Sequence, residues 1–363
     1  MRDTGILPDG EIAALFETGA LAAERPLDGD QIQPASLDLR LGAVAYRVRA
    51  SFLPGPDHRV ADKLARFSLH EIDLTGGAVL ETGCVYIVPL VERLALPDGI
   101  AASTNPKSST GRLDIFTRVM SDHGQEFDKV PAGYRGPLYI EVSPRTFPIV
   151  VRAGSRLSQI RFRRGVAALD EAALAALHAR ETLVASAAPN ITGGGIALSI
   201  DLGGGGDGLI GYRAKHHTGL IDVDRRDAYD LEDFWEPIRA RGRGELVLDP
   251  DEFYILVSRE AVHVPPLHAA EMTPFDPLVG EFRVHYAGFF DPGFGHTPAG
   301  GGGSRAVLEV RSHEVPFILD HGQIVGRLVY EHMLARPGAL YGAALKSHYQ
   351  GQALKLSKHF RAG

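Results

Sequence analysis

The sequence is poor in cysteine and has no excess of positive charge. Its 363 residues include one cysteine, Cys84, so no disulfide can form within the chain and a cysteine-rich zinc site is excluded. A single thiol is typical of a reducing compartment, and we expect a cytoplasmic protein. The formal net charge of −7 argues against a general nucleic-acid binder, because phosphate backbones are held by excess lysine and arginine.

Long apolar runs are also missing. No run approaches the roughly 20 residues that cross a bilayer. The N-terminal stretch MRDTGILPDGEIAALF lacks the basic-then-apolar pattern of a signal peptide. We therefore expect no membrane partner. Hydrophobic residues make up 44% of the chain and charged residues 23%, as in ordinary globular proteins, and the length predicts about two domains.

The chain contains an internal repeat with a spacing of 168 positions. The segment VLETGCVYIVPL is matched by VLDPDEFYILVS, and Glu141 in LYIEVSPRTFP is matched by Glu309 in AVLEVRSHEVP, both 168 residues later. Solenoid repeats are much shorter, about 20–50 residues. The spacing therefore predicts two homologous domains, which we place at residues 1–190 and 191–363.

Most of the sequence predicts β-structure. Runs such as VYIVPLVERLAL, LYIEV and FYILVS are β-branched or aromatic and are bounded by Pro, Gly and Asp. Few helices are expected. PDGEIAALFETGAL has Asp9 as a candidate N-cap, and ALDEAALAALHARETL has Asp170. We expect the second helix to close the first half, just before the connection ASAAPNITGGG.

The stretch NPKSSTGRLD (105–114) is polar and turn-prone. The hydroxyls of Ser108 and Ser109 can donate hydrogen bonds to phosphate oxygens, and Arg112 adds a planar two-pronged donor beside Lys107. The same composition also fits an ordinary surface turn. The residues alone leave both interpretations open.

The second half contains a turn and a carboxylate of interest. In HYAGFFDPGFGH, the sequence Asp-Pro-Gly at 291–293 is strong turn chemistry, and the phenylalanines could wall a flat ring. Glu309 follows in an apolar strand between Leu308 and Val310. On an alternating strand it would face solvent. If the side chain of Glu309 points inward instead, burial would raise the pKa of its carboxyl, which would suit general acid–base chemistry.

Two other polar features carry little information by themselves. The segment YGAALKSHYQGQ (341–352) reads as a flexible tail. The histidine pairs at 216–217 and at 263 and 268 lack further ligands at sensible spacing, so no metal site is expected there.

Together these segments resemble the deoxycytidine triphosphate (dCTP) deaminases, relatives of the trimeric dUTPases. IQPASLDLRLG resembles the family's N-terminal signature, and PKSSTGR resembles its Arg-Ser-Ser-x-x-Arg phosphate motif with Lys107 in place of the first arginine. AGFFDPGF is similar to the hairpin that contacts base and sugar, and VLE (307–309) to the strand that bears the catalytic glutamate. Tyr341, His348 and Gln352 fall at the spacing of the family's C-terminal tail, and His348 stands where the family usually has lysine. The implied substrate contacts are Lys107, Ser108, Ser109, Arg112, Ala287, Asp291, Val307, Leu308, Tyr341, His348 and Gln352.

The resemblance implies a fold and an activity. The fold is mainly β, with two tandem dUTPase-like β-clip domains, each a distorted jelly-roll barrel, and a few short helices. The activity is zinc-free hydrolytic deamination of dCTP to dUTP, which supplies thymidylate synthesis. Mg²⁺ would accompany the triphosphate, and dTTP is a candidate feedback ligand. Family members are usually homotrimers, so a homo-oligomer is expected.

The two halves have lost complementary parts of the family's site. Asp276 and Gly280 stand where the repeat would place Ser108 and Arg112, while the first half lacks the Asp-Pro-Gly turn. We therefore hypothesise one composite site, with Ser108 and Arg112 meeting the hairpin and Glu309 of the second half. The rival hypothesis uses Glu141 as the catalytic carboxylate.

Three functions remain open on the sequence. The leading one is a dCTP deaminase. A dUTPase, or a bifunctional enzyme that continues to dUMP and pyrophosphate, would use the same architecture. A non-catalytic nucleotide-binding protein belongs to another class, and the intact Glu309 weighs against it.

Overall fold

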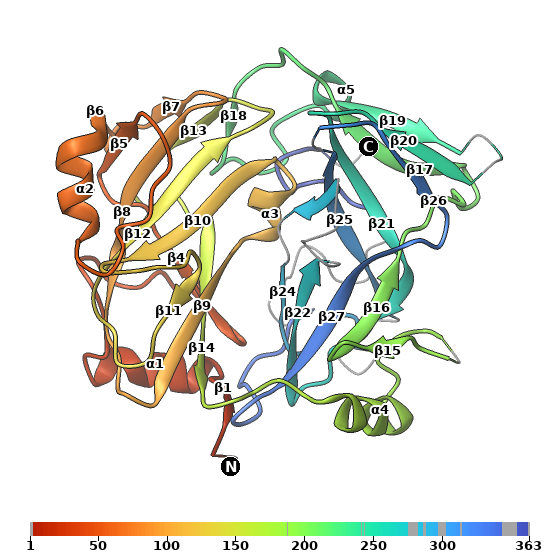
Figure 1. The fold of residues 1–363 in the computed structure, drawn as a ribbon, viewed down its shortest axis with the longest axis horizontal. Helices are drawn as coiled ribbons and strands as arrows, with labels where there is room; N and C mark the ends of the chain where they lie inside the picture. Colours follow the sequence, from red (N-terminus) through yellow and green to blue (C-terminus); the bar gives the residue numbers. More distant parts are fainter. Residues whose placement is uncertain are drawn as a thin grey trace.

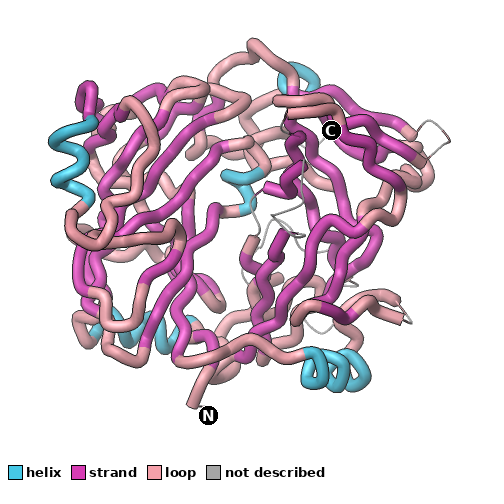
Figure 2. The backbone as a smooth tube through the Cα atoms, in the orientation of Figure 1, coloured by secondary structure: helices cyan, strands magenta, loops and turns pink. Residues whose placement is uncertain are grey.

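The computed structural model describes residues 3–186, 188–240, 242, 244–274, 282–285, 288–296, 303–312, 314–342 and 354–361. Two β-rich bodies lie side by side, the first half of the chain in one and most of the second half in the other (Figure 1). Helices are few and short beside the strands (Figure 2). The chain is thus mainly β, as expected. None of the helices in the described part is long and apolar enough to span a bilayer.

The elements of the first half alternate short strands with three helices or helical turns. They are β1 (Gly5–Ile6), α1 (Asp9–Glu17), β2 (Leu21–Ala23), β3 (Ile32–Gln33), β4 (Ser36–Leu39), β5 (Val44–Val48), α2 (Val60–Phe67), β6 (Ser68–Asp73), β7 (Ala78–Leu80), β8 (Val85–Ala95), β9 (Ile100–Pro106), α3 (Ser108–Gly111), β10 (Ile115–Ser121), β11 (Lys129–Val130), β12 (Arg135–Pro144), β13 (Ile149–Val151) and β14 (Ser158–Arg164).

The second half follows the same plan. Its elements are α4 (Glu171–Arg180), β15 (Ile191–Thr192), β16 (Gly195–Ser199), β17 (Leu209–Ala214), β18 (Ile221–Asp222), α5 (Leu231–Phe234), β19 (Trp235–Arg239), β20 (Glu245–Leu248), β21 (Phe253–Val262), β22 (His268–Pro274), β23 (Phe282–His285), β24 (Phe289–Phe290), β25 (Ser304–Ser312), β26 (Phe317–Asp320) and β27 (Ile324–His332).

The strand pairing repeats with the spacing seen in the sequence. The sheet order β10-β12-β8-β5-β6 in the first half corresponds to β23-β25-β21-β17-β19 in the second. Ile87 pairs with Glu141 in the first sheet, and Ile255 pairs with Glu309 in the second, each residue 168 positions from its counterpart. The two glutamates therefore occupy the same place in equivalent sheets.

Each body has its own apolar core, and the first core reaches across the junction. The larger buried cluster combines first-half residues such as Ile140 and Phe147 with Trp235 and Phe360 from the second half. A second cluster lies within the other body. The parallel pairing of β18 with β13 joins the halves as well. The two bodies are therefore continuous in packing and in hydrogen bonding.

Two sequence-based expectations about helices differ from the structure. Asp9 is not the cap of α1, because Pro8 holds that position and the Asp9 carboxylate accepts bonds from the backbone of Gly338 and Ala339, at 2.9 and 3.0 Å. Helix α4 was expected to close the first half, but its buried leucines pack in the second cluster. Asp170 caps that helix as predicted, accepting from the Ala173 amide at 2.8 Å.

A fully buried arginine crosses the junction. Arg161 on β14 is 1% exposed, and its guanidinium nitrogens lie 3.3 Å from carboxylate oxygens of Asp291 and Glu331 in the second half. It also donates to the Ala270 carbonyl at 3.0 Å and lies 4.1 Å from the centre of the Phe289 ring. One side chain thus satisfies two buried carboxylates.

We expect Arg161→Met to lower the free energy of unfolding by about 3–5 kcal/mol, because it leaves buried carboxylates without this cation. The measurement is urea unfolding followed by fluorescence. The control is Arg213→Met, which removes an exposed ion pair with Glu236 and should cost about 0–1 kcal/mol. Equal midpoints for the two variants would contradict the structural role of Arg161.

Candidate functional site

The phosphate-motif turn lies at the junction of the two bodies. Helical turn α3 follows β9 directly and is seen between the bodies, facing β25 and β24 (Figure 1). Lys107 holds the N-cap position and Arg112 the C-cap position of this turn. Ser109 is 6% exposed and Arg112 3% exposed, while Ser108 is half-buried. The turn is therefore an interior feature, and the alternative of an ordinary surface turn is wrong.

Glu309 points into the protein interior rather than to solvent. It is 6% exposed, on β25. Burial raises the pKa of the Glu309 carboxyl to about 8, since a charged carboxylate is poorly solvated there. The positive charge of Arg112 lowers this pKa, and Asp114 raises it. The charge of Arg112 in the first half thus acts on the carboxyl of Glu309 in the second half, 197 residues later in the sequence.

Asp114 helps to fix this part of the junction. It is 1% exposed and has a positive φ of 54°, which turns the chain sharply after Arg112. Its carboxylate accepts from the guanidinium of Arg311, two residues beyond Glu309 on the same strand, and from the Thr146 hydroxyl at 2.6 Å. A buried ion pair therefore ties the end of the turn to the strand that carries the glutamate.

Glu141, the counterpart of Glu309, has a different environment. Arg118 of the same half donates to its Oε1 at 2.7 Å, and Ser51 donates to its Oε2. The Arg118 guanidinium also lies 3.6 Å from the centre of the Phe127 ring. Glu141 is consequently held as an ion-paired carboxylate within the first half.

The hairpin residue Asp291 faces the first half. It is 8% exposed, and burial raises the pKa of its carboxyl, while the Arg161 guanidinium lowers it. Charges of Asp38 and Lys107 also act on it. Lys107 is ion-paired with Asp38. Lys107 of the turn, Asp38 and Asp291 of the hairpin therefore form one group of interacting charges.

Aromatic rings line the hairpin, as the sequence indicated. Phe290 and Phe294 meet edge to face with centroids 5.0 Å apart, and Tyr341 lies 5.6 Å from Phe294. The Tyr341 amide donates to the Pro292 carbonyl at 2.8 Å. Among the other predicted contacts, Val307 and Leu308 are buried on β25. Ala287, His348 and Gln352 lie outside the described residues.

The C-terminal residues 354–361 contribute contacts that the sequence did not predict. Arg112 Nη1 donates to the Lys355 carbonyl at 2.8 Å. The Ser357 hydroxyl donates to the Ser109 carbonyl at 2.9 Å. The motif resemblance ended at Gln352, and no pattern in ALKLSKHF marks these residues as partners of a turn some 250 positions earlier.

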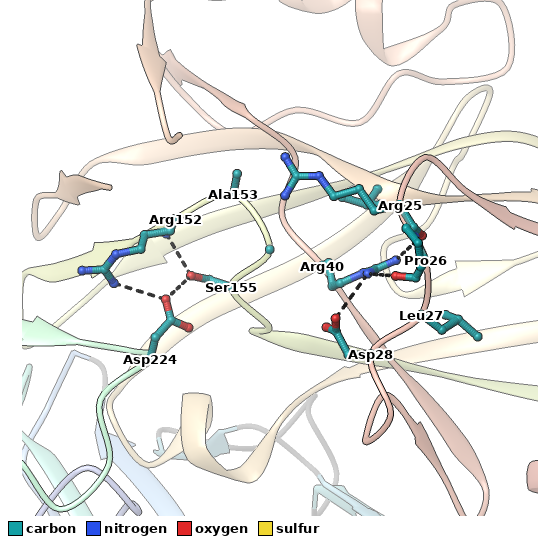
Figure 3. A pocket seen from close by; sticks show the side chains of 11 residues that line it. Arg25, Pro26, Leu27, Asp28, Arg40, Arg152, Ala153, Ser155 and Asp224 are labelled. Carbon is teal, nitrogen blue, oxygen red and sulfur yellow. Dashed lines mark hydrogen bonds and ion pairs between the residues drawn. The ribbon is translucent and has the colours of Figure 1, made fainter. Parts of the chain in front are cut away.

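A pocket of about 550 Å³ is lined by polar and apolar residues, among them Asp224. Figure 3 shows Arg25 and Arg40 on one side of the residues that line it and Arg152 on the other. Asp224 and Ser155 are joined by a hydrogen bond at 2.6 Å. None of the predicted site residues lines it. The pocket is therefore separate from the group formed by Arg112 and Glu309.

Comparisons with known proteins agree with the sequence motifs. The N-terminal domain model of 2'-deoxycytidine 5'-triphosphate deaminase matches residues 3–166, and the C-terminal domain model matches residues 170–360. The crystal structure of 2'-deoxycytidine 5'-triphosphate deaminase from Agrobacterium tumefaciens is 75% identical, with a TM-score of 0.88. The similarity covers 92% of this chain and 100% of that one.

Curated relatives align with less than half of the chain. A "dCTP deaminase, dUMP-forming" from Coprothermobacter proteolyticus is 30% identical over 43% of this chain and 81% of its own. A "dCTP deaminase" from Haloarcula marismortui is 32% identical over 43% of this chain and 79% of its own. The two matched domain models and the 75% identical structure lead to one conclusion: this chain belongs to the 2'-deoxycytidine 5'-triphosphate deaminase family.

Proposed function

We propose that the chain deaminates dCTP hydrolytically at one composite site, built from the turn of the first half and β25 of the second. The observation that carries this proposal is the buried Glu309 on β25. Burial raises the pKa of its carboxyl to about 8, and the charge of Arg112 from the other half lowers it. A carboxyl with such a pKa can both accept and donate protons near neutral pH. Tandem β-clip domains are the architecture that we infer for it.

The chemistry requires one proton-shuttling group. Glu309 accepts a proton from water as the water oxygen bonds to C4 of cytosine, and it passes that proton to N3. In the tetrahedral intermediate, Glu309 takes the proton of the new C4 hydroxyl and gives it to the amine. The C4–N bond then breaks, ammonia leaves, and C4 keeps the water oxygen as a carbonyl. The balanced reaction is dCTP and water to dUTP and ammonia. The positive charge of Arg112 limits how far the pKa of the Glu309 carboxyl rises.

The opposite end of the substrate would be bound by the turn. Lys107, Ser108, Ser109 and Arg112 offer cationic and hydroxyl donors suited to phosphate oxygens. In the described residues no three or more carboxylate, histidine or cysteine groups gather as a metal cage. We propose that Mg²⁺ enters with the triphosphate and is held mainly by phosphate oxygens and water.

Glu309 and Glu141 provide matched variants. We expect Glu309→Gln to lower kcat for ammonia release by about 10²–10⁴-fold, the usual contribution of a positioned acid–base group. Glu141→Gln should keep most activity, because Arg118 and Ser51 hold Glu141 apart from the turn. The assay is ammonia release from dCTP with magnesium. Loss of activity only in Glu141→Gln would refute the composite site.

The raised pKa of Glu309 predicts a pH dependence. The residue must be deprotonated to accept a proton from water, so kcat/KM should rise with pH to a plateau, with a midpoint near 8. Because the Arg112 charge lowers this pKa, Arg112→Met should move the midpoint to higher pH. A flat profile between about pH 6 and 9 would contradict the role of Glu309.

The identity of the final product is a second question, since the relatives carry both "dCTP deaminase" and "dCTP deaminase, dUMP-forming" names. We expect ammonia and dUTP as the products. Pyrophosphate released together with ammonia would instead establish the bifunctional enzyme. Binding of dCTP without any ammonia at high enzyme concentration would establish the non-catalytic nucleotide-binding protein.

A further inference from the structure

The partner of Asp114 across the junction, Arg311, stands next to Glu309 on the same strand. Arg311 follows Glu309 by two positions on β25, and this stretch pairs with β21 in regular register. Because side chains alternate between the two faces of a strand, both point to the same face, with backbone positions roughly 7 Å apart. Glu309 is 6% exposed and Arg311 is 7% exposed. A buried cation therefore neighbours the candidate acid–base group.

Asp114 reaches this cation from the end of the phosphate-motif turn. Its carboxylate accepts from the Arg311 guanidinium and, at 2.6 Å, from the Thr146 hydroxyl, which in turn accepts from Arg311 at 3.1 Å. The Asp114 carbonyl accepts from the Arg145 amide at 3.0 Å, and the Arg145 charge also acts on the carboxyl. Three side chains thus close a ring of hydrogen bonds between the two halves.

The duplicated halves differ at the position of Arg311. By the repeat spacing of 168, the first half has Ser143 there, two residues after Glu141. A serine hydroxyl carries no charge, and a buried carboxylate that loses its cation is strongly destabilising. A second copy of the first half in this place would leave Asp114 without the cation that Arg311 supplies. The pair therefore favours contact of the turn with β25 of the second half.

The charges around Glu309 come from several elements. From the first half, the charge of Arg112 lowers the pKa of the Glu309 carboxyl and that of Asp114 raises it. On the neighbouring strands, His285 of β23 lies opposite Glu309 in register, and the opposite residue on β21 is apolar. Arg311 balances the charge of Asp114. Loss of either member of the pair would consequently expose Glu309 to the unbalanced charge of the other.

We propose that Asp114 and Arg311 act together as a positioning pair for proton transfer at Glu309, holding the turn of the first half against β25 and keeping the surroundings of the carboxyl electrically balanced. The inference rests on the proposed function, because both residues act through Glu309 and not by contact with the reacting atoms. It assigns a role in the reaction to two residues outside the motifs of the resemblance.

The pH dependence of kcat/KM gives the first test. Arg311→Met leaves the Asp114 carboxylate unbalanced, which disfavours a negative charge on Glu309, so the midpoint should move to higher pH. Asp114→Asn keeps a hydrogen-bond acceptor but leaves Arg311 unbalanced, so the midpoint should move to lower pH. Each shift should be about 0.5–1 pH unit, as expected for one charge at roughly 7 Å. Shifts in the same direction, or no shifts, would overturn the proposal.

The double variant Asp114→Asn/Arg311→Met keeps the test decisive if Arg311→Met does not fold. It removes both charges together, so no unpaired charge remains in the interior. Its midpoint should return close to that of the unmodified protein and lie above that of Asp114→Asn. Equal midpoints for the double variant and Asp114→Asn would show that Glu309 does not sense the charge of Arg311, which would refute the pair.

The matched control is Arg152→Met. Arg152 of the first half forms a two-pronged ion pair with Asp222 of the second half, with both N–O distances at 2.7 Å. The change removes another arginine–aspartate pair across the junction, but Arg152 lines the separate pocket with Asp224. Its pH midpoint should match that of the unmodified protein. A shift equal to that of Arg311→Met would reduce the effect to the loss of any contact between the halves and would contradict the specific role.

Titration of Glu309 without turnover separates this inference from the proposed function. Carbon-13 NMR of the full chain, labelled at the glutamate carboxyls, reports the protonation of Glu309, and Glu309→Gln identifies its signal. If no ammonia is released from dCTP but the two single variants move this titration in opposite directions, the proposed function fails and the balance of charge at Glu309 stands. If dCTP is deaminated and the titration stays fixed in both variants, the positioning pair fails alone.

Discussion

The contact between the two halves is the constraint on which the rest of the structure depends. Apolar residues of both halves share one core. Buried ion pairs also cross the junction: Arg161 pairs with Glu331, and Asp114 pairs with Arg311. These charges are shielded from water, so their partners must be matched closely. The same junction brings the carboxyl of Glu309 in one half under the influence of the Arg112 charge in the other.

Duplication gave the protein two glutamates in equivalent positions, and their surroundings made them different. Glu141 is bound by an arginine and a serine of its own half. Glu309 is buried with only partial compensation by Arg112, and burial raises its pKa to about 8. A carboxyl at the same strand position thus serves as a structural ion-pair partner in one half and as the acid–base candidate in the other.

The repeat allowed much of the fold to be predicted. A constant spacing of 168 predicted equivalent strands, and the pairing of Ile87 with Glu141 and of Ile255 with Glu309 confirms the equivalence. Local cap prediction succeeded for Asp170, whose partner is three residues away. It was wrong for Asp9, because that carboxylate bonds to Gly338 and its neighbour, far away in the sequence.

The amino-acid sequence by itself determined the mainly β composition, the duplicated plan and the types of residue available for phosphate binding and proton transfer. The alternation of residue types and the repeat spacing of 168 positions can both be read directly along the chain. Only the tertiary structure decided that Glu309 faces inward, that the charge of Arg112 acts on it, and that residues 354–361 return to the turn. Those features depend on burial and on contacts between segments roughly 200–250 residues apart, which no local pattern specifies.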